Sequence, residues 1–238
     1  MRRTPTQAPR QRLWSALGAG LLLLALAGQA RAVTVDEIEQ RIRKKLDQRW
    51  DFNNLVVRVE PYSQPETDKG YLKSILMQAD VAKWKGVALR PIYLRSEDVV
   101  LDLPALLVDN KLETKSSKKT TFLAKISEAD LNGLFKKKNM PIKNPKIELG
   151  QGDVTFTGTY QVGRLGSNLK LNGVFTVKNE THLWFTARKG WVSGIPLPAA
   201  LLNQVLSLLN PLLDFSELPF SPRVKKFEIK DKAIAVEG

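Results

Sequence analysis

Alternation of apolar and polar residues along residues 154–187 is the feature that most constrains the fold of this chain. Successive side chains of a β-strand point to opposite faces, so a period of two predicts strands with one apolar face. The apolar positions of the first two predicted strands are Val154, Phe156, Tyr160, Val162, Leu169, Leu171, Phe175 and Val177. A third strand begins at Leu183. The pattern therefore predicts an antiparallel meander with one apolar face.

Two glycines interrupt this alternation. Gly158 and Gly173 each stand where the pattern requires an apolar residue in the middle of a strand. Glycine inside a strand is typical of a β-bulge or a sharp bend. We therefore expect the predicted sheet to be strongly curved.

An unusually apolar helix is predicted after Pro198, because proline is tolerated at the start of a helix. Its leucines and one valine form two adjoining stripes that extend to Leu213, and only a narrow polar strip remains. We expect such a helix to be almost completely surrounded, with the curved sheet as its cover. The predicted fold class is α+β, with a long, strongly curved antiparallel sheet around an apolar helix.

Two more helices carry N-terminal capping signals. Thr34 with Glu37 forms a capping box before an amphipathic helix of about fourteen residues, which we expect to dock on its own domain. Ser127 with Asp130 opens a second helix, which ends in the lysines of residues 136–138. Strand-like sequence lies between them, in the segments 55–59, 71–87 and 99–103, and residues 115–119 form an expected exposed loop.

The N-terminus has the organisation of a secretory signal peptide. Four arginines precede an uncharged run from Leu13 to Ala30, and Ala30-Arg31-Ala32 is a small-x-small cleavage pattern. We expect residues 1–32 to be removed between Ala32 and Val33. Residues 33–238 would then form a single domain, periplasmic or otherwise extracytoplasmic. The alternative is a retained membrane anchor, since about 18 apolar residues are the lower limit for a span.

Charge limits the possible partners. Residues 33–238 contain 32 basic and 24 acidic residues, a net charge of +8. Outside the cytoplasm a basic surface meets anionic lipid headgroups or acidic glycans rather than nucleic acid. The charge could also serve only solubility. There is no cysteine, so stability must come from packing without disulfides.

Residues for catalysis or metal binding are missing from the sequence. The lack of cysteine excludes a thiol nucleophile and thiolate ligands. The single histidine, His182, cannot form a histidine-based metal site alone, and no Gly-x-Ser-x-Gly motif is present. Ser-x-x-Lys occurs at 116–119 and 167–170, but in loops or strand starts. We therefore predict no catalytic residue, no metal and no cofactor.

Several short segments carry a resemblance to a known family, by their order and spacing. They are residues 126–132, a strand pair ending at Gly158, residues 194–198, residues 218–220 and a closing hairpin ending at Gly238. This arrangement resembles the LmeA-like phospholipid-binding proteins of bacterial envelopes, most closely from Lys125 onward. The resemblance implies a half-barrel similar to the tubular lipid-binding (TULIP) folds, an apolar groove and no catalytic residues. Some relatives are membrane-tethered, whereas this chain is expected to be released.

The predicted function is non-enzymatic binding of phospholipid in the envelope, and transfer of the bound phospholipid is compatible with it. Acyl chains would lie between sheet and helix, where each methylene buried contributes about 0.8 kcal/mol. The candidate lining residues are Val154, Phe156, Tyr160, Leu171, Phe175, Leu202, Leu206 and Leu209. The same residues could instead form a closed core. The alternatives are a scaffold that binds an envelope protein, or a hydrolase acting on lipid or glycan.

Overall fold

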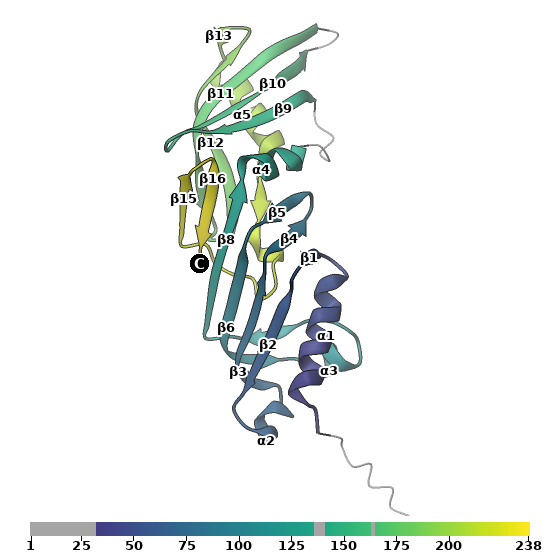
Figure 1. Cartoon of the computed structure of the whole chain (residues 1–238). Helices are drawn as coiled ribbons and strands as arrows, with labels where there is room; N and C mark the ends of the chain where they lie inside the picture. The colour runs from purple at the N-terminus through teal and green to yellow at the C-terminus, as the bar shows by residue number, and fades with distance from the viewer. Residues whose placement is uncertain (1–31, 136–140, 163–164) are drawn as a thin grey trace, which may run out of the picture. The chain divides into compact units, whose positions relative to one another are not determined.

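Antiparallel strands dominate the computed structural model, which describes residues 32–135, 141–162 and 165–238 (Figure 1). The large sheet contains, in spatial order, β15 (Lys226–Lys230), β16 (Ala233–Glu237), β8 (Lys119–Ser127), β6 (Ile92–Leu101), β3 (Tyr71–Ala79) and β2 (Val56–Pro61). A short strand, β7 (Thr114–Ser116), also pairs with β6. A third, small sheet has the order β1 (Asp51–Asn53), β4 (Val81–Trp84) and β5 (Val87–Leu89). Along the chain, β1 precedes β2, and β4 and β5 lie between β3 and β6.

The predicted meander is confirmed as a second sheet, which we call the meander sheet. It contains, in order, β13 (Ile195–Pro196), β12 (His182–Val192), β11 (Leu165–Lys178), β10 (Val154–Val162) and β9 (Ile142–Leu149), and β14 (Leu213–Asp214) also pairs with β12. Both predicted bulges are present. The pairing of β9 with β10 shifts at Gly158, and that of β11 with β12 shifts at Gly173.

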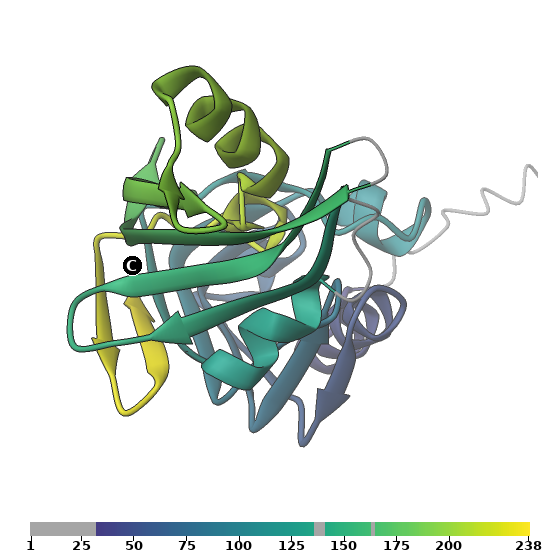
Figure 2. The same cartoon turned by 90° about the horizontal axis from the view of Figure 1, so that it is seen from above.

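Two helices close the edges of the meander sheet (Figure 2). Helix α4 (Glu128–Phe135) lies at the β9 edge, where the Asn132 side chain accepts from Ile147 N at 2.7 Å and donates to Ile147 O at 2.8 Å. Asn210, which ends helix α5 (Ala199–Leu209), bonds Phe185 N and O in the same way, both at 2.8 Å. Each amide side chain thus replaces a missing strand.

The helices predicted from capping signals are present. Helix α1 (Val35–Asp47) is capped by Thr34, whose hydroxyl accepts from Glu37 N, and it buries its apolar stripe against its own domain. Helix α4 is capped by Ser127, whose hydroxyl accepts from Asp130 N at 3.1 Å. The lysines of residues 136–138 lie outside the described residues.

Two expectations about local structure were wrong, and two short elements were missed. Residue 103 does not continue a strand, because Asp102 caps a short helix, α3 (Leu103–Leu107), whose first turn holds Pro104. The apolar helix α5 ends at Leu209 and not at Leu213, since Pro211 cannot continue it. A four-residue helix, α2 (Gln64–Thr67), and a 3-10 turn, η1 (Phe215–Glu217), were not predicted.

The expected burial of α5 was also wrong. Only Val205 and Leu209 of this helix are buried, and Leu201 is 44% exposed. The cause is geometric: α5 packs mainly against β12 near the edge of the meander sheet, so one side of the helix faces outward.

The predicted fold class is confirmed. The described residues form an α+β fold with large curved antiparallel sheets and no closed barrel, compatible with a half-barrel that wraps a helix. Residues 32–238 form one compact unit, with a continuous apolar core through both larger sheets. The expected signal peptide lies outside the described residues apart from Ala32.

A first prediction concerns the bulge at Gly173. A Cβ added there would lie 2.1 Å from Thr186 O, so the backbone of β12 would have to move. We expect Gly173→Ala to lower the free energy of unfolding by about 1–3 kcal/mol, measured by urea denaturation. Asn168→Ala, an exposed position on the same strand, is the control, and equal stability of the two variants would contradict the bulge argument.

A second prediction concerns pH. Burial is the largest single effect on the pKa of Asp130, and it raises that pKa. Hydrogen bonds from Arg90 and Ser127, together with the charge of Arg90, outweigh burial, so the pKa of Asp130 is lowered. Because the folded pKa is depressed, this stabilisation is complete above the unfolded pKa of about 3.9 and is lost as the pH falls through the folded value.

Asp130→Asn should therefore destabilise the protein by about 1.5–3 kcal/mol at pH 7, and by progressively less below pH 4. Denaturation curves from pH 7 to pH 2.5 measure this difference. Asp231→Asn, at an exposed turn, is the matched control. A deficit in Asp130→Asn that does not change with pH would show that the charge of Asp130 is not responsible.

Candidate functional site

Most of the candidate lining residues lie in the packed core of the structure. Five of them are at most 3% exposed: Val154, Phe156, Leu171, Phe175 and Leu209. Aromatic rings fill the space under the meander sheet. Phe156 contacts Phe135 of α4 with ring centroids 5.7 Å apart, and both Phe156 and Phe175 lie 6.4 Å from Phe185. These five candidate residues are therefore part of the packed core under the meander sheet.

The other three candidate residues, Tyr160, Leu202 and Leu206, are half-buried and pack against this core. Leu202 and Leu171 meet over Gly190: a Cβ on that glycine would lie 3.1 Å from Leu202 Cδ1 and 2.7 Å from Leu171 Cδ2. We call this contact between α5 and β12 the helix–sheet seam. At the helix–sheet seam, the buried candidate Leu171 and the half-buried candidate Leu202 lie next to each other.

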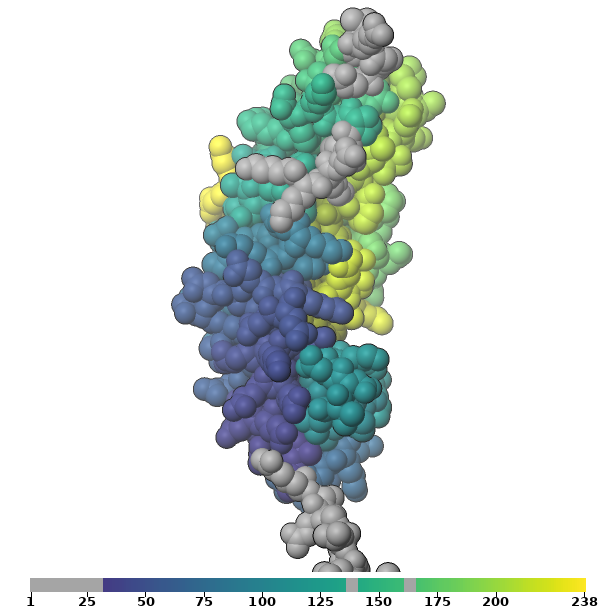
Figure 3. Space-filling model, turned by 90° about the vertical axis from the view of Figure 1, so that its right-hand side faces the viewer, coloured from purple at the N-terminus to yellow at the C-terminus, as the bar shows by residue number. Residues whose placement is uncertain are grey.

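A groove lies elsewhere, where three chain segments meet on the face shown in Figure 3. Its volume is about 1240 Å³. One wall is the C-terminal end of α1 and the residues after it, a second is the loop after α3, and a third is the segment from η1 to Ser221. The apolar lining residues are Leu46, Trp50, Trp84, Leu112, Leu218, Pro219 and Phe220. We call this hollow the tryptophan groove.

Stacked rings form the floor of the tryptophan groove. Trp50 and Trp84 are nearly parallel, with centroids 5.4 Å apart and planes at 9°, and Phe52 extends the stack at 5.8 Å from Trp50. Both tryptophans are buried. A second hollow of about 590 Å³ is also lined by Trp50 and Trp84. The stack therefore borders both hollows.

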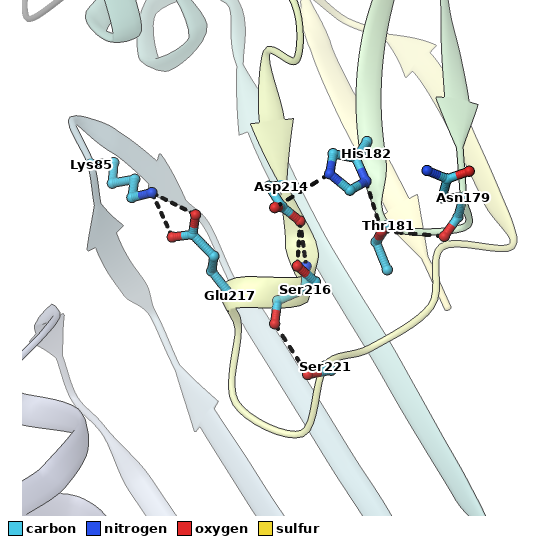
Figure 4. Close-up of polar contacts among 8 residues, drawn as sticks. All are labelled: Lys85, Asn179, Thr181, His182, Asp214, Ser216, Glu217 and Ser221. Atoms are coloured by element: carbon cyan, nitrogen blue, oxygen red, sulfur yellow. Dashed lines mark hydrogen bonds and ion pairs between the residues drawn. The ribbon is translucent and has the colours of Figure 1, made fainter.

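Charged side chains surround the groove. Lys85 forms an ion pair with Glu217 at 2.5 Å and also lies 5.2 Å from the centroid of the Trp84 ring, which joins the small sheet to η1 (Figure 4). Within the described part of the chain, the side chains of the rim cations Arg49 and Lys111 have no hydrogen-bond or ion-pair partner. The carboxylates of Asp109 and Glu113 also line the groove, so its lining carries both signs of charge, and Arg49 and Lys111 are the cations placed to meet an anionic group there.

Sequence reasoning missed the tryptophan groove because its walls are far apart in the sequence. Trp50 follows a helix, and Trp84 ends a strand, so each fits an ordinary core residue. One local signal existed in residues 218–220, where two apolar residues flank a proline in a segment with no regular structure. Phe220 and Ser221 both have positive φ, 60° and 41°, a conformation that side chains seldom adopt without a local constraint.

The single histidine is half-buried and engaged in polar contacts, rather than a free surface residue (Figure 4). His182 Nδ1 lies 2.8 Å from the Thr181 hydroxyl, and Nε2 lies 3.4 Å from Asp214. The Thr181 hydroxyl donates to Asn179 O, which makes it part of the turn. Burial opposes ionisation of Asp214 most, but hydrogen bonds from Ser216 and the nearby charges of His182 and Lys85 leave its pKa lowered. These contacts hold β12, β14 and η1 together.

Other acidic residues are also engaged in ion pairs. Glu97 lies 3.7 Å from Arg95, and Asp98 lies 3.4 Å from Lys118. Among the described residues, no group of three histidine, cysteine or acidic side chains is placed to hold a metal ion. No helix in the same part of the chain is long and apolar enough to cross a membrane.

Comparison with known proteins identifies the family. The family model of LmeA-like phospholipid-binding proteins matches residues 25–238, nearly the whole chain. No curated protein and no solved structure matches the chain. The match includes both sheets, the helix–sheet seam and the tryptophan groove. The chain therefore belongs to the LmeA-like phospholipid-binding family.

Proposed function

We propose that this protein binds a phospholipid. One acyl chain would lie in the tryptophan groove, and the phosphate would lie near Arg49 and Lys111. The observation that carries this proposal is an open groove with an apolar floor and unpaired cations at its rim, in a chain of a phospholipid-binding family. Apolar walls suit the acyl chain, and cations suit the phosphate. We further propose that binding involves no chemical change of the lipid.

The size of the groove supports this assignment. Sites for small ligands occupy about 300–1,000 Å³, so a groove of about 1240 Å³ can accept a larger molecule. Each methylene that leaves water contributes about 0.8 kcal/mol, so a chain of sixteen carbons gains on the order of 10 kcal/mol before ordering costs. A chain that enters the groove only in part gains proportionally less, so affinity should rise with the length of acyl chain that is buried.

The helix–sheet seam is the second candidate position for an acyl chain. Leu202 and Leu206 are half-exposed there, and the candidate residues beneath them are buried. A chain could enter only if α5 moved away from β12, because the rings of Phe156, Phe175 and Phe185 fill the space below. The tryptophan groove requires no such opening, which favours it.

We also propose that the protein acts outside the cytoplasm after cleavage between Ala32 and Val33. The backbone N of Val33 donates to Asp68 Oδ1 at 3.0 Å. Cleavage would turn that nitrogen into an α-ammonium group, so the contact would become an ion pair. N-terminal sequencing of the exported protein should therefore give Val33 as its first residue. A retained N-terminus in that fraction would contradict the proposal.

A third prediction tests the groove. Phe220→Asp and Leu112→Asp place a carboxylate on the apolar lining, beside the expected acyl chain. Aspartate tolerates the positive φ of residue 220 better than phenylalanine, so Phe220→Asp should fold. We expect phospholipid that co-purifies with residues 33–238 without detergent to fall at least about tenfold, measured by extraction and mass spectrometry.

Val108→Asp is the matched control, because Val108 lies in the same loop region, is 81% exposed and does not line the groove. Leu202→Asp places the same charge in the helix–sheet seam. Loss of lipid in Leu202→Asp alone would move the site to the seam. Folded wild-type protein that contains no lipid would contradict the proposal and favour a protein-binding scaffold.

A further inference from the structure

The turn from β12 to β13 lies at one end of the meander sheet (Figure 1), and the residues beside it form an exposed apolar surface. Ile195 is 71% exposed and Leu201, in the first turn of α5, is 44% exposed. Trp191, Val192 and Leu197 are half-buried beside them. The turn at Ser193 and Gly194 has positive φ at both residues, 49° and 82°, which allows a tight hairpin and projects Ile195 from the sheet. We call residues 191–201 the apolar tip.

The sequence around the apolar tip is almost free of acid. No charged residue occurs from Trp191 to Leu213, and Glu180 is the only acidic residue between Val154 and Leu213. Glu180 lies in the turn from β11 to β12, at the other end of these strands, and pairs with Arg223 at 3.1 Å. No acidic side chain in this stretch therefore opposes an anionic surface at the tip.

Exposed cations border the apolar tip. Lys170 lies directly across from Trp191 in the β11–β12 ladder, and Lys189 lies across from Asn172. Lys143 of β9 lies across from Thr159 near the same end of the sheet. Together with Arg188, these side chains are exposed and have no hydrogen-bond or ion-pair partner in the described part of the chain. The tip thus combines projecting apolar side chains with cations that form no ion pair, and of these Lys170 lies near enough to Glu148 to help lower the pKa of that carboxyl.

We infer that the apolar tip docks this protein on the surface of an anionic bilayer. Ile195 and Leu201 would enter the headgroup–acyl boundary, Trp191 would lie at the interface, and Lys170 and Lys189 would meet anionic headgroups. No residue of the apolar tip lines either hollow at Trp50 and Trp84. The tip is a projecting surface, which suits contact with a deformable lipid surface. Helix α5 has 11 residues, too few to span a bilayer, which is consistent with docking in the interface plane.

This inference builds on the proposed function, because a lipid-binding protein must reach the membrane that supplies its ligand. It does not require that the lipid lie in the tryptophan groove. The docking surface and the groove use different residues, so each can be removed without the other. This separation makes the two proposals independently testable.

A fourth prediction measures docking by co-sedimentation of residues 33–238 with vesicles of phosphatidylcholine alone, or mixed with phosphatidylglycerol. Wild type should bind the mixed vesicles. Binding should weaken as the salt concentration rises from about 0.05 to about 0.5 M, because salt screens the attraction between the cations and the anionic headgroups. Ile195→Asp and Leu201→Asp should each bind at least about tenfold more weakly. Val108→Asp, an exposed apolar position outside the tip, should bind as wild type.

Charge is tested with a pair of double variants. Lys170→Glu with Lys189→Glu should abolish the preference for phosphatidylglycerol. Lys225→Glu with Lys230→Glu is the control, because it makes the same change in net charge at exposed residues away from the tip. Lys225 precedes β15 and Lys230 ends it, and this double variant should keep the preference. Equal loss in both double variants would show a general charge effect and would overturn the assignment of the tip.

A short-chain phospholipid below its micellar concentration separates this proposal from the groove. Ile195→Asp should bind the dissolved lipid as wild type does but fail to bind vesicles. Phe220→Asp should show the reverse. If Ile195→Asp binds vesicles as wild type does, docking at the tip is wrong, whatever the dissolved lipid does. If wild type binds vesicles but no dissolved lipid, the groove proposal fails and the tip remains.

Discussion

The structure depends on how the edges of the curved meander sheet are closed. A strand edge leaves backbone N–H and C=O groups unpaired, and burying them without partners is costly. Asn132 pairs both groups of Ile147 at the β9 edge, and Asn210 pairs both groups of Phe185 at the β12 edge. These two contacts fix α4 and α5 against the sheet. They allow the sheet to end at helices without closing into a barrel.

The position of α5 follows from the same arrangement and has a functional consequence. A helix fixed along a sheet edge can bury only one side, so Val205 and Leu209 enter the core while Leu201 remains exposed. The interior is then filled by aromatic side chains, including Phe156 and Phe185. Part of this apolar helix therefore forms an external apolar surface. The proposed lipid groove lies between other elements, where Trp50 and Trp84 stack.

Much of the fold was predictable because its signals are local. The alternation from Val154 onward fixed the meander, and Gly158 and Gly173 marked both bulges. The capping residues Thr34 and Ser127 marked two helix starts. Helix α3 was missed because its cap, Asp102, interrupts an alternating apolar pattern, and a period of two over so few residues does not separate strand from helix. The length of α5 was overestimated because leucines continue beyond Pro211.

The sequence by itself determined the fold class, the strand pattern, the basic charge of residues 33–238 and the absence of cysteine. Its resemblance to a phospholipid-binding family pointed to the class of ligand. Only the tertiary structure decided which apolar residues are core and which line a hollow. Val154 and Leu112 are both apolar, but one lies under a sheet and the other borders a groove. That difference arises from contacts between segments far apart in the chain, which periodicity within one segment does not encode.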